Sequence, residues 1–224
     1  MQDSADKSAI RDAATLLLIR GTGRDAQVLM GQRGAKAAFM PDKFVFPGGA
    51  VDATDAVVPL ARPVSAACSA RLAQGHAQPQ ALAAAAIREL WEETGLMLGQ
   101  AGDWPDPPAD WQGFAAHGLV PDAHGLRYIF RAITPPGRPR RFDARFFLAQ
   151  ADAVQGDLDD FSQACDELSH LQWVSLRDAR KLNLPFITEI VLSEAQAWIE
   201  GEAMDPSVPF FDNATDVSRF RRIA

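Results

Sequence analysis

Three glutamates near the end of one predicted helix are the residues of this sequence best suited to chemistry. Glu89, Glu92 and Glu93 stand at positions i, i+3 and i+4, so at 100° per residue they project from one surface of a helix. Like charges at this spacing destabilise a helix by about 0.2–0.5 kcal/mol per pair, and these lie near Gly95, at the negative end of the helix dipole. Mg²⁺ or Mn²⁺ prefers oxygen ligands and would remove both penalties. The pattern therefore indicates either a metal site or a solvated acidic helix face.

A glycine turn earlier in the chain offers a further ligand. Phe46-Pro47-Gly48-Gly49 ends a short predicted strand, and its glycines expose backbone carbonyl and amide groups. Beside the glutamates, the carbonyl of Gly48 becomes a candidate metal ligand. In isolation the same turn would have only a structural meaning.

Together these segments resemble the Nudix box. That pattern is a glycine, five residues, an acid, seven residues, and then Arg-Glu-U-x-Glu-Glu-x-Gly-U, in which U is an apolar residue. Gly49 and Asp55 match its first half, and residues 88–96 match its second half. Asp55 stands where the family has glutamate, and 32 residues, 25 more than usual, separate it from Arg88. The resemblance implies that Asp55 pairs with Arg88 and that Arg88 orients Glu89 or Glu92.

One branch of the family, similar to the peroxisomal coenzyme A diphosphatases, carries such an insertion. The chain resembles that branch in Gln32-Arg33, Phe39-Met40-Pro41, FPGGAVDATD (46–55) and RRFDARFF (140–147). The resemblance implies metal-dependent hydrolysis of a nucleoside diphosphate linked to another group, with coenzyme A as the first guess. It also makes Arg33 a candidate substrate contact and a homodimer a candidate assembly.

A fourth acid comes later in the chain. Glu167 lies six residues before Trp173, where many Nudix enzymes carry a metal-binding or base glutamate. The resemblance thus makes Glu167 a candidate metal ligand and, as an alternative to Glu89, a candidate base. The candidate catalytic residues are Glu89, Glu93, Arg88 and Glu167, and the candidate metal ligands are Gly48, Glu89, Glu92, Glu93 and Glu167. A surface-loop acid is the other interpretation of Glu167.

One cluster of arginines could bind phosphate. Its members are Arg138, Arg140, Arg141 and Arg145. Strand alternation would place Arg141 and Arg145 on one face. A forked guanidinium binds phosphate through paired hydrogen bonds, so Arg141 is a candidate substrate contact. Solvation, or pairing with the surplus of acids, is the alternative.

Composition limits the partners and the location. A net charge of −7 and a pI near 5.1 argue against a nucleic-acid-binding protein. Cys68 and Cys165 form neither a disulfide framework nor a metal-ligand spacing. The start of the chain is polar, and the apolar run 13–19 is too short to span a membrane. We expect a cytoplasmic protein that acts on a small nucleotide-like molecule and binds neither nucleic acid nor membrane.

The elements that must position these residues follow from hydrophobic runs and from breakers. Strands are predicted at 13–19, 26–33, 43–46, 126–134, 140–150 and 170–176. Helices are predicted at 79–94, 175–182 and 186–200. We expect a helical insertion at 56–78, a loop-like segment at 103–125 and a polar C-terminal arm at 205–224. The order predicts one domain over 1–224, an α/β/α sandwich in which the glutamate helix packs against a mixed sheet.

Two other classes of function remain open. A nucleotide-sensing module of the same fold would bind its ligand without cleaving it, but it would have no need of all three glutamates. A metal-dependent isomerase would need a cysteine in the pocket, and only Cys165 lies near a candidate site residue. A serine nucleophile is unsupported, because the sequence has no G-x-S-x-G elbow.

Overall fold

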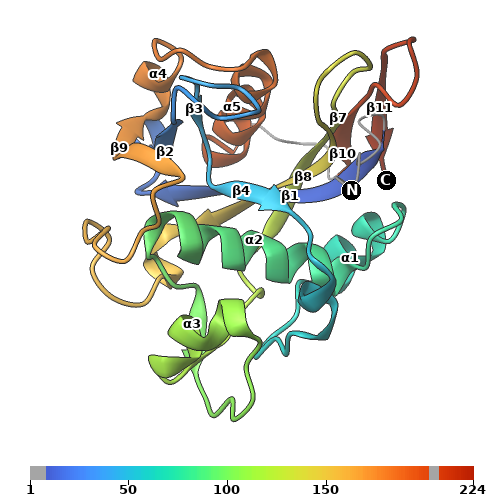
Figure 1. The fold of residues 1–224 in the computed structure, drawn as a ribbon. Coiled ribbons are helices and arrows are strands. Elements are labelled where there is room, and N and C mark those ends of the chain that lie inside the picture. Colours follow the sequence, from blue (N-terminus) through green and yellow to red (C-terminus); the bar gives the residue numbers. More distant parts are fainter. Residues whose placement is uncertain (1–8, 202–206) are drawn as a thin grey trace.

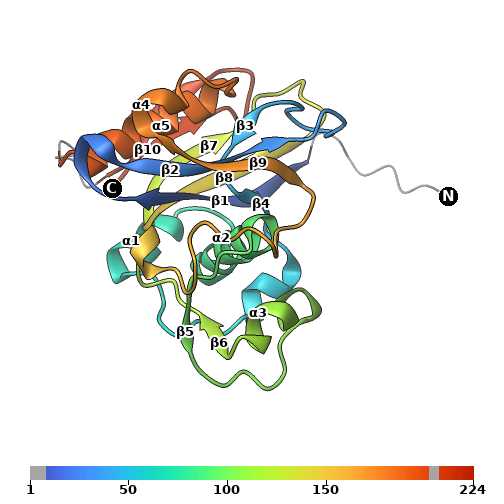
Figure 2. The same cartoon turned by 90° about the vertical axis from the view of Figure 1, so that its left-hand side faces the viewer.

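The computed structural model describes residues 9–201 and 207–224. A nine-stranded mixed sheet forms the middle layer of the molecule (Figures 1 and 2), in the order β11-β10-β7-β8-β1-β2-β3, with β4 also paired to β1 and β9 to β2. Its strands are β1 (Ile10–Arg20), β2 (Gln27–Arg33), β3 (Phe44–Val45), β4 (Gly48–Ala50), β7 (Arg127–Ile133), β8 (Arg141–Gln150), β9 (Leu168–Ser175), β10 (Val208–Asp212) and β11 (Arg219–Ile223).

Helices cover both faces of this sheet. The layer on one face contains α4 (Leu176–Ala179) and α5 (Phe186–Ile199), and the layer on the other contains α1 (Ala66–Leu72) and α2 (Pro79–Thr94). Beyond α2 lie α3 (Gln112–Ala116) and a two-stranded sheet of β5 (Gly99–Ala101) and β6 (Leu119–Pro121). The predicted α/β/α sandwich with a mixed sheet is therefore confirmed. Within the described ranges, no helix is both long and apolar enough to cross a membrane.

Strand β1 is the centre of the sheet. Its apolar run is continuous, as expected of a strand buried on both faces. Leu16 and Leu18 belong to the core beneath α2, whereas Leu17 and Ile19 belong to the core beneath α5. The strand pairs in parallel with β8 and antiparallel with β4, and Thr15 lies opposite Gly48 in the latter pair. This pairing fixes the glycine turn over the face that α2 covers.

Helix α2 has the bounds that the sequence predicts. Pro79 occupies the first turn, where its missing N–H costs nothing, and Gly95 ends the helix with a φ of 76°. The alanines at 83–86 are fully buried, because their small side chains let the helix approach the sheet closely. Nearly all other residues of the helix are buried too, and Glu89 and Glu93 are among them.

The C-terminal segment differs from the predicted polar arm. Residues 208–212 form β10, which pairs in parallel with β7, and β11 pairs antiparallel with β10. Val208, Phe210 and Ile223 are buried, so this segment adds two strands to the sheet rather than standing free. Residues 205 and 206 of the predicted arm lie outside the described residues.

Of two further segments, one agrees with its predicted structure and the other has more structure than predicted. The predicted helical insertion 56–78 contains the helix α1, which Ser65 caps by accepting a hydrogen bond from the amide of Cys68 at 3.2 Å. The segment 103–125, predicted as a loop, contains α3 and β6. Short 3₁₀ turns occur at Gly23–Asp25, Ala53–Val57 (η2), Ala109–Trp111 (η3) and Ala151–Ala153 (η4).

Candidate active site

Arg88 connects the two halves of the predicted motif. Its Nε and Nη2 donate to the two oxygens of Asp55 at 3.0 and 3.1 Å, and Nη2 also donates to the carbonyl of Ala50 at 2.9 Å. Its Nη1 donates to Glu89 at 2.9 Å and to Glu92 at 3.0 Å. Asp55 is 0% exposed and Arg88 is 3% exposed, so each buried charge needs the other. The pairing with Asp55 and the contacts to two glutamates are those that the family resemblance implies.

The long insertion leaves Asp55 docked against Arg88. Asp55 belongs to η2, and its Oδ2 accepts a hydrogen bond from the amide of Asp52 at 2.8 Å in a reciprocal capping arrangement. The insertion therefore lengthens the connection to Arg88 without separating the pair. Sequence reasoning missed the roles of Asp52 and of the Ala50 carbonyl, although the spacing Asp-x-x-Asp was a visible capping signal.

Gly48 and Gly49 lie too close to their neighbours to carry side chains. A Cβ on Gly49 would stand 2.5 Å from the carboxyl carbon of Glu89 and 2.6 Å from its Oε2. A Cβ on Gly48 would stand 2.7 Å from the carbonyl oxygen of Ala14. The amide of Gly48 donates to Glu93 at 2.8 Å, so the turn meets the helix through its N–H in this structure. The metal-ligand role predicted for the Gly48 carbonyl stays a prediction.

Burial sets the electrostatics of the three glutamates. Glu89 is 9% exposed and Glu93 is 2% exposed, so the alternative of a solvated acidic face is wrong for these two residues. Burial raises the pKa of Glu89 to about 7, against the opposing effect of Arg88. Burial, with the charge of Glu89, raises the pKa of Glu93 well above its usual value, and burial also raises the pKa of Glu92. One guanidinium, that of Arg88, contacts two of the three glutamates, so the cluster holds more carboxylates than cations, and a bound cation would offset the surplus.

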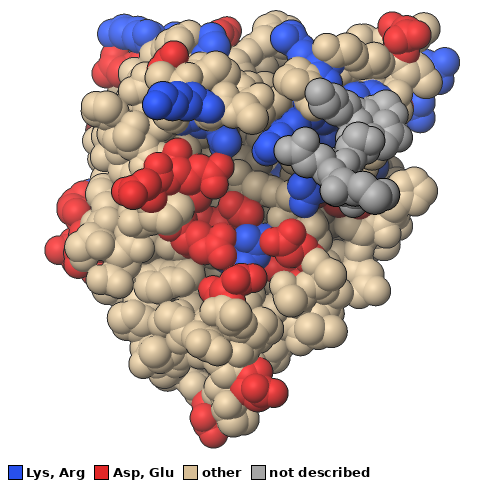
Figure 3. Space-filling model, viewed as in Figure 1, with Lys and Arg blue, Asp and Glu red and all other residues tan. Residues whose placement is uncertain are grey.

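The surface around these residues is strongly acidic. Figure 3 shows Asp and Glu side chains gathered in a hollow of the face that carries α2, with Lys and Arg side chains above them. Within the described residues, no three His, Cys, Asp or Glu side chains converge closely enough to form a ready set of metal ligands. Protein donors hold the carboxylates instead. By donor chemistry, carboxylate oxygens beside a backbone turn are the ligands that a hard cation such as Mg²⁺ or Mn²⁺ prefers.

Glu167 and Arg33 lie next to this cluster. Arg33 Nη2 donates to Glu167 Oε1 at 2.9 Å, and Arg33 Nε donates to the carbonyl of Phe39 at 3.0 Å. The charge of Glu167 is close enough to contribute to the raised pKa of both Glu89 and Glu93. The structure therefore brings together residues of β2, of α2 and of the segment before β9.

Arg141 lies elsewhere. It pairs with Ile10 on β1, four positions from Ala14, which is the partner of Gly49, so about 13 Å of strand separates the two places. Its guanidinium donates to the carbonyls of Thr134 at 3.0 Å, Asn213 at 2.9 Å and Ala214 at 3.1 Å. The bonds to Asn213 and Ala214 hold the C-terminal segment, so the guanidinium of Arg141 is occupied away from the acidic cluster.

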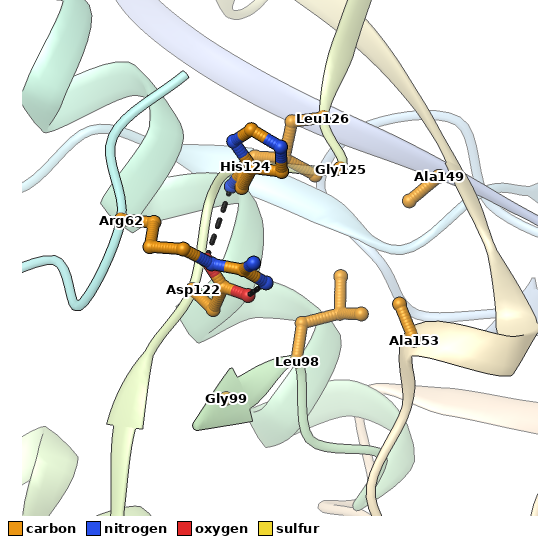
Figure 4. Close-up of a pocket in the computed structure, with 9 residues that line it drawn as sticks. All are labelled: Arg62, Leu98, Gly99, Asp122, His124, Gly125, Leu126, Ala149 and Ala153. Atoms are coloured by element: carbon orange, nitrogen blue, oxygen red, sulfur yellow. Dashed lines mark hydrogen bonds and ion pairs between the residues drawn. The ribbon is translucent and has the colours of Figure 1, made fainter. Parts of the chain in front are cut away.

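Two cavities lie apart from the acidic cluster. The first encloses about 210 Å³ and is drawn in Figure 4; Arg62 there donates to both oxygens of Asp122 and so ties the insertion to the end of β6. The second encloses about 530 Å³ beside the start of α2, between Leu60 and Gln80. None of the predicted site residues lines either cavity.

Comparison with known proteins agrees with this fold and site. The family model of the NUDIX domain matches residues 9–192. The chain is 30% identical over 184 residues to putative nudix hydrolase 7 of Caenorhabditis elegans, covering 76% of this chain and 53% of that protein. It is 27% identical over 205 residues to acyl-coenzyme A diphosphatase NUDT19 of Gallus gallus, covering 62% of this chain and 54% of that protein. The chain thus spans about half the length of these curated relatives.

A solved structure shows the same likeness. The crystal structure of a NUDIX hydrolase from Alicyclobacillus acidocaldarius superposes with a TM-score of 0.64 at 32% identity, over 83% of this chain and 90% of that one. The fold places an acidic helix against a mixed sheet, next to a glycine turn. The chain belongs to the Nudix family. Membership supports hydrolysis of a diphosphate bond, and Nudix enzymes generally use divalent metals such as Mg²⁺ or Mn²⁺.

Proposed function

We propose that this chain hydrolyses the diphosphate linkage of a nucleoside diphosphate joined to another group, with coenzyme A or a related nucleotide as the first candidate. The observation that carries the proposal is the set of buried carboxylates around Arg88, with raised pKa values, beside two glycines that leave room for them. The similarity to an acyl-coenzyme A diphosphatase supports the choice of candidate.

The residues divide into two groups by role. Glu89, Glu92 and Glu93 would hold Mg²⁺ or Mn²⁺, with the Gly48 carbonyl and Glu167 as further ligands. Arg88 and Asp55 position Glu89 and Glu92. The ion pair with Asp55 fixes the guanidinium of Arg88, and both glutamates accept hydrogen bonds from that guanidinium. When bound, the cation would polarise a phosphoryl oxygen, lower the pKa of the attacking water and offset charge on the leaving group.

A carboxylate of the cluster takes the proton of the attacking water. Glu89 and Glu167 are the two candidates for this base. A general base works best with a pKa near the working pH, and burial raises that of Glu89 to about 7. Arg33 would bind a phosphate of the substrate through its forked guanidinium. A homodimer is the assembly that we propose for the active protein.

The test is a diphosphatase assay with Mg²⁺ or Mn²⁺ on coenzyme A, NADH, ADP-ribose and oxidised nucleotides. Glu93→Gln should lower turnover by orders of magnitude while thermal unfolding stays cooperative. Glu189→Gln, an exposed acid on α5 across the sheet, is the matched control and should leave turnover unchanged. Full activity of Glu93→Gln, or of the wild type in excess chelator, would refute the mechanism.

The same assay separates the rival functions. A nucleotide sensor would bind one of these compounds tightly and release no product. An isomerase would need a reactive cysteine, but burial and the neighbouring carboxylates raise the pKa of Cys165 and so disfavour its thiolate. Cys165→Ser should therefore retain its hydrolytic activity.

A further inference from the structure

One contact in the acidic cluster is more exposed than the others. Buried or half-buried donors hold Glu89, Glu92 and Glu93, namely Arg88 and the amide of Gly48. The side chain of Glu167 is 53% exposed, and its ion pair with Arg33 faces solvent. Exposed ion pairs are weak, since water and salt screen them. This pair is therefore the contact in the cluster that exchanges most easily.

Arg33 is itself held firmly. Its amide donates to the carbonyl of Lys43 at 2.9 Å, and its carbonyl accepts from the amide of Asp42 at 3.2 Å. Its Nε donates to the carbonyl of Phe39 at 3.0 Å, and its side chain is only 17% exposed. The stem of the side chain is thus fixed by the β2–β3 connection, while the outer nitrogens can change partner without moving the backbone.

Glu167 lies near both Arg33 and the acids of α2, because it bonds to the first and its charge raises the pKa of Glu89 and Glu93. Leu168, the next residue, lies opposite Arg33 in the β2–β9 register. Two residues before Glu167, the amide of Cys165 donates to the carbonyl of Glu92 at 2.8 Å and ties this segment to the end of α2. One side chain can therefore turn either to the guanidinium or to the glutamates.

We propose that Arg33 and Glu167 form a latch that exchanges partners when a divalent cation binds, an inference that rests on the proposed function. With a cation at the α2 glutamates, the exposed side chain of Glu167 would turn from the guanidinium of Arg33 to the divalent ion, which carries more charge. Arg33 then no longer pairs with the carboxylate of Glu167, while its guanidinium stays in place beside the cluster. There it can bind phosphate oxygens with paired hydrogen bonds. Cation and diphosphate therefore bind cooperatively, because the first frees the arginine that the second needs.

Isothermal titration calorimetry tests this without turnover, with Mn²⁺ alone and with ADP in the presence and absence of Mn²⁺. In the wild type, Mn²⁺ should tighten ADP binding about tenfold or more. Arg33→Gln removes the competing ion pair, so it should bind Mn²⁺ about two- to fivefold more tightly. The same variant should lose most of the tightening of ADP binding by Mn²⁺.

A second arginine provides the matched control. Arg20 donates to Asp159 at 2.8 Å in a more exposed pair, with the arginine side chain 39% exposed, and this pair tethers the same connection between β8 and β9. Arg20→Gln should leave Mn²⁺ affinity unchanged. This result would show that tighter Mn²⁺ binding by Arg33→Gln comes from the freed Glu167 and not from a loosened connection between β8 and β9. Arg33→Lys keeps the charge without the fork, so Mn²⁺ affinity should stay near the wild-type value while the ADP response falls.

The outcomes are distinguishable. Unchanged or weaker Mn²⁺ binding by a folded Arg33→Gln would overturn the latch and make Arg33 a support for Glu167 as a ligand. A full ADP response in Arg33→Lys would overturn the forked contact. Absence of Mn²⁺ binding by the wild type would overturn the proposed function and the latch together.

Discussion

Replacing Gly49 by alanine should disable the site while leaving the fold intact. The added Cβ would stand 2.5 Å from the carboxyl carbon of Glu89, whereas ordinary contact begins near 3.4 Å. The carboxylate must therefore retreat by about 0.9 Å, the difference between the two distances. A misplacement of about 1 Å in a catalytic group can cost on the order of 100-fold in rate. The clash falls on the movable end of a side chain, so we expect unfolding temperatures within a few degrees of the wild type.

The assay is the initial rate of product release with saturating Mn²⁺, together with a thermal melt. Gly125→Ala is the matched control, because a Cβ there meets nothing within 4 Å and Gly125 lies near the cavity of Figure 4, away from the acids. Its rate should equal that of the wild type. A Gly49→Ala protein that unfolds normally and keeps its rate within threefold of the wild type would show that the position of Glu89 does not govern the reaction.

The buried charges, the metal site and Arg141 can each be tested by a separate change. Asp55→Ala leaves Arg88 buried without its main partner, so urea unfolding should report a loss of about 3–5 kcal/mol, and a loss below 1 kcal/mol would contradict the buried pair. Because the folded pKa of Glu89 is raised from 4.5 to about 7, its contribution to stability is present below pH 4.5 and is lost as pH rises through 7. The free energy of unfolding, measured in chelator, should fall between pH 4.5 and 7. A free energy of unfolding that rises with pH over this range would contradict the raised pKa of Glu89. Mn²⁺ at 100 times its Kd should stabilise the fold by about 2.7 kcal/mol, or about 5–10 °C in Tm, whereas Glu93→Gln should show little shift. Arg141→Gln should increase hydrogen exchange in β10 and β11 without changing KM, and a raised KM would restore Arg141 as a substrate contact.

Local signals in the sequence were enough to place the glutamate helix. Pro79 and Gly95 mark its two ends because each acts on the backbone next to it. The pairing of Asp55 with Arg88 also followed, through the family pattern rather than through spacing. The helix periodicity identified the acidic face correctly but not what covers it, and burial by the glycine turn gives Glu89 its raised pKa.

Non-local pairing explains what the sequence did not reveal. Strand β11 reads as a basic, polar segment, and it becomes a strand because β10 pairs with β7, about eighty residues earlier. The bond between Arg33 and Glu167 joins residues 134 positions apart, so no local pattern encodes it. The short strand β4 consists largely of glycine and depends on its register with β1. In each case the partner strand determines the structure, and the segment alone does not.

Anomalous diffraction from crystals soaked in Mn²⁺ would show whether the carboxylates of α2 bind a metal ion. We expect a peak within coordinating distance of Glu89 and Glu93, with their side chains turned from Arg88 and Gly48 towards it. A soaked crystal without a peak beside these carboxylates, or with the ion bound elsewhere and the cluster unchanged, would contradict a metal-dependent site on α2.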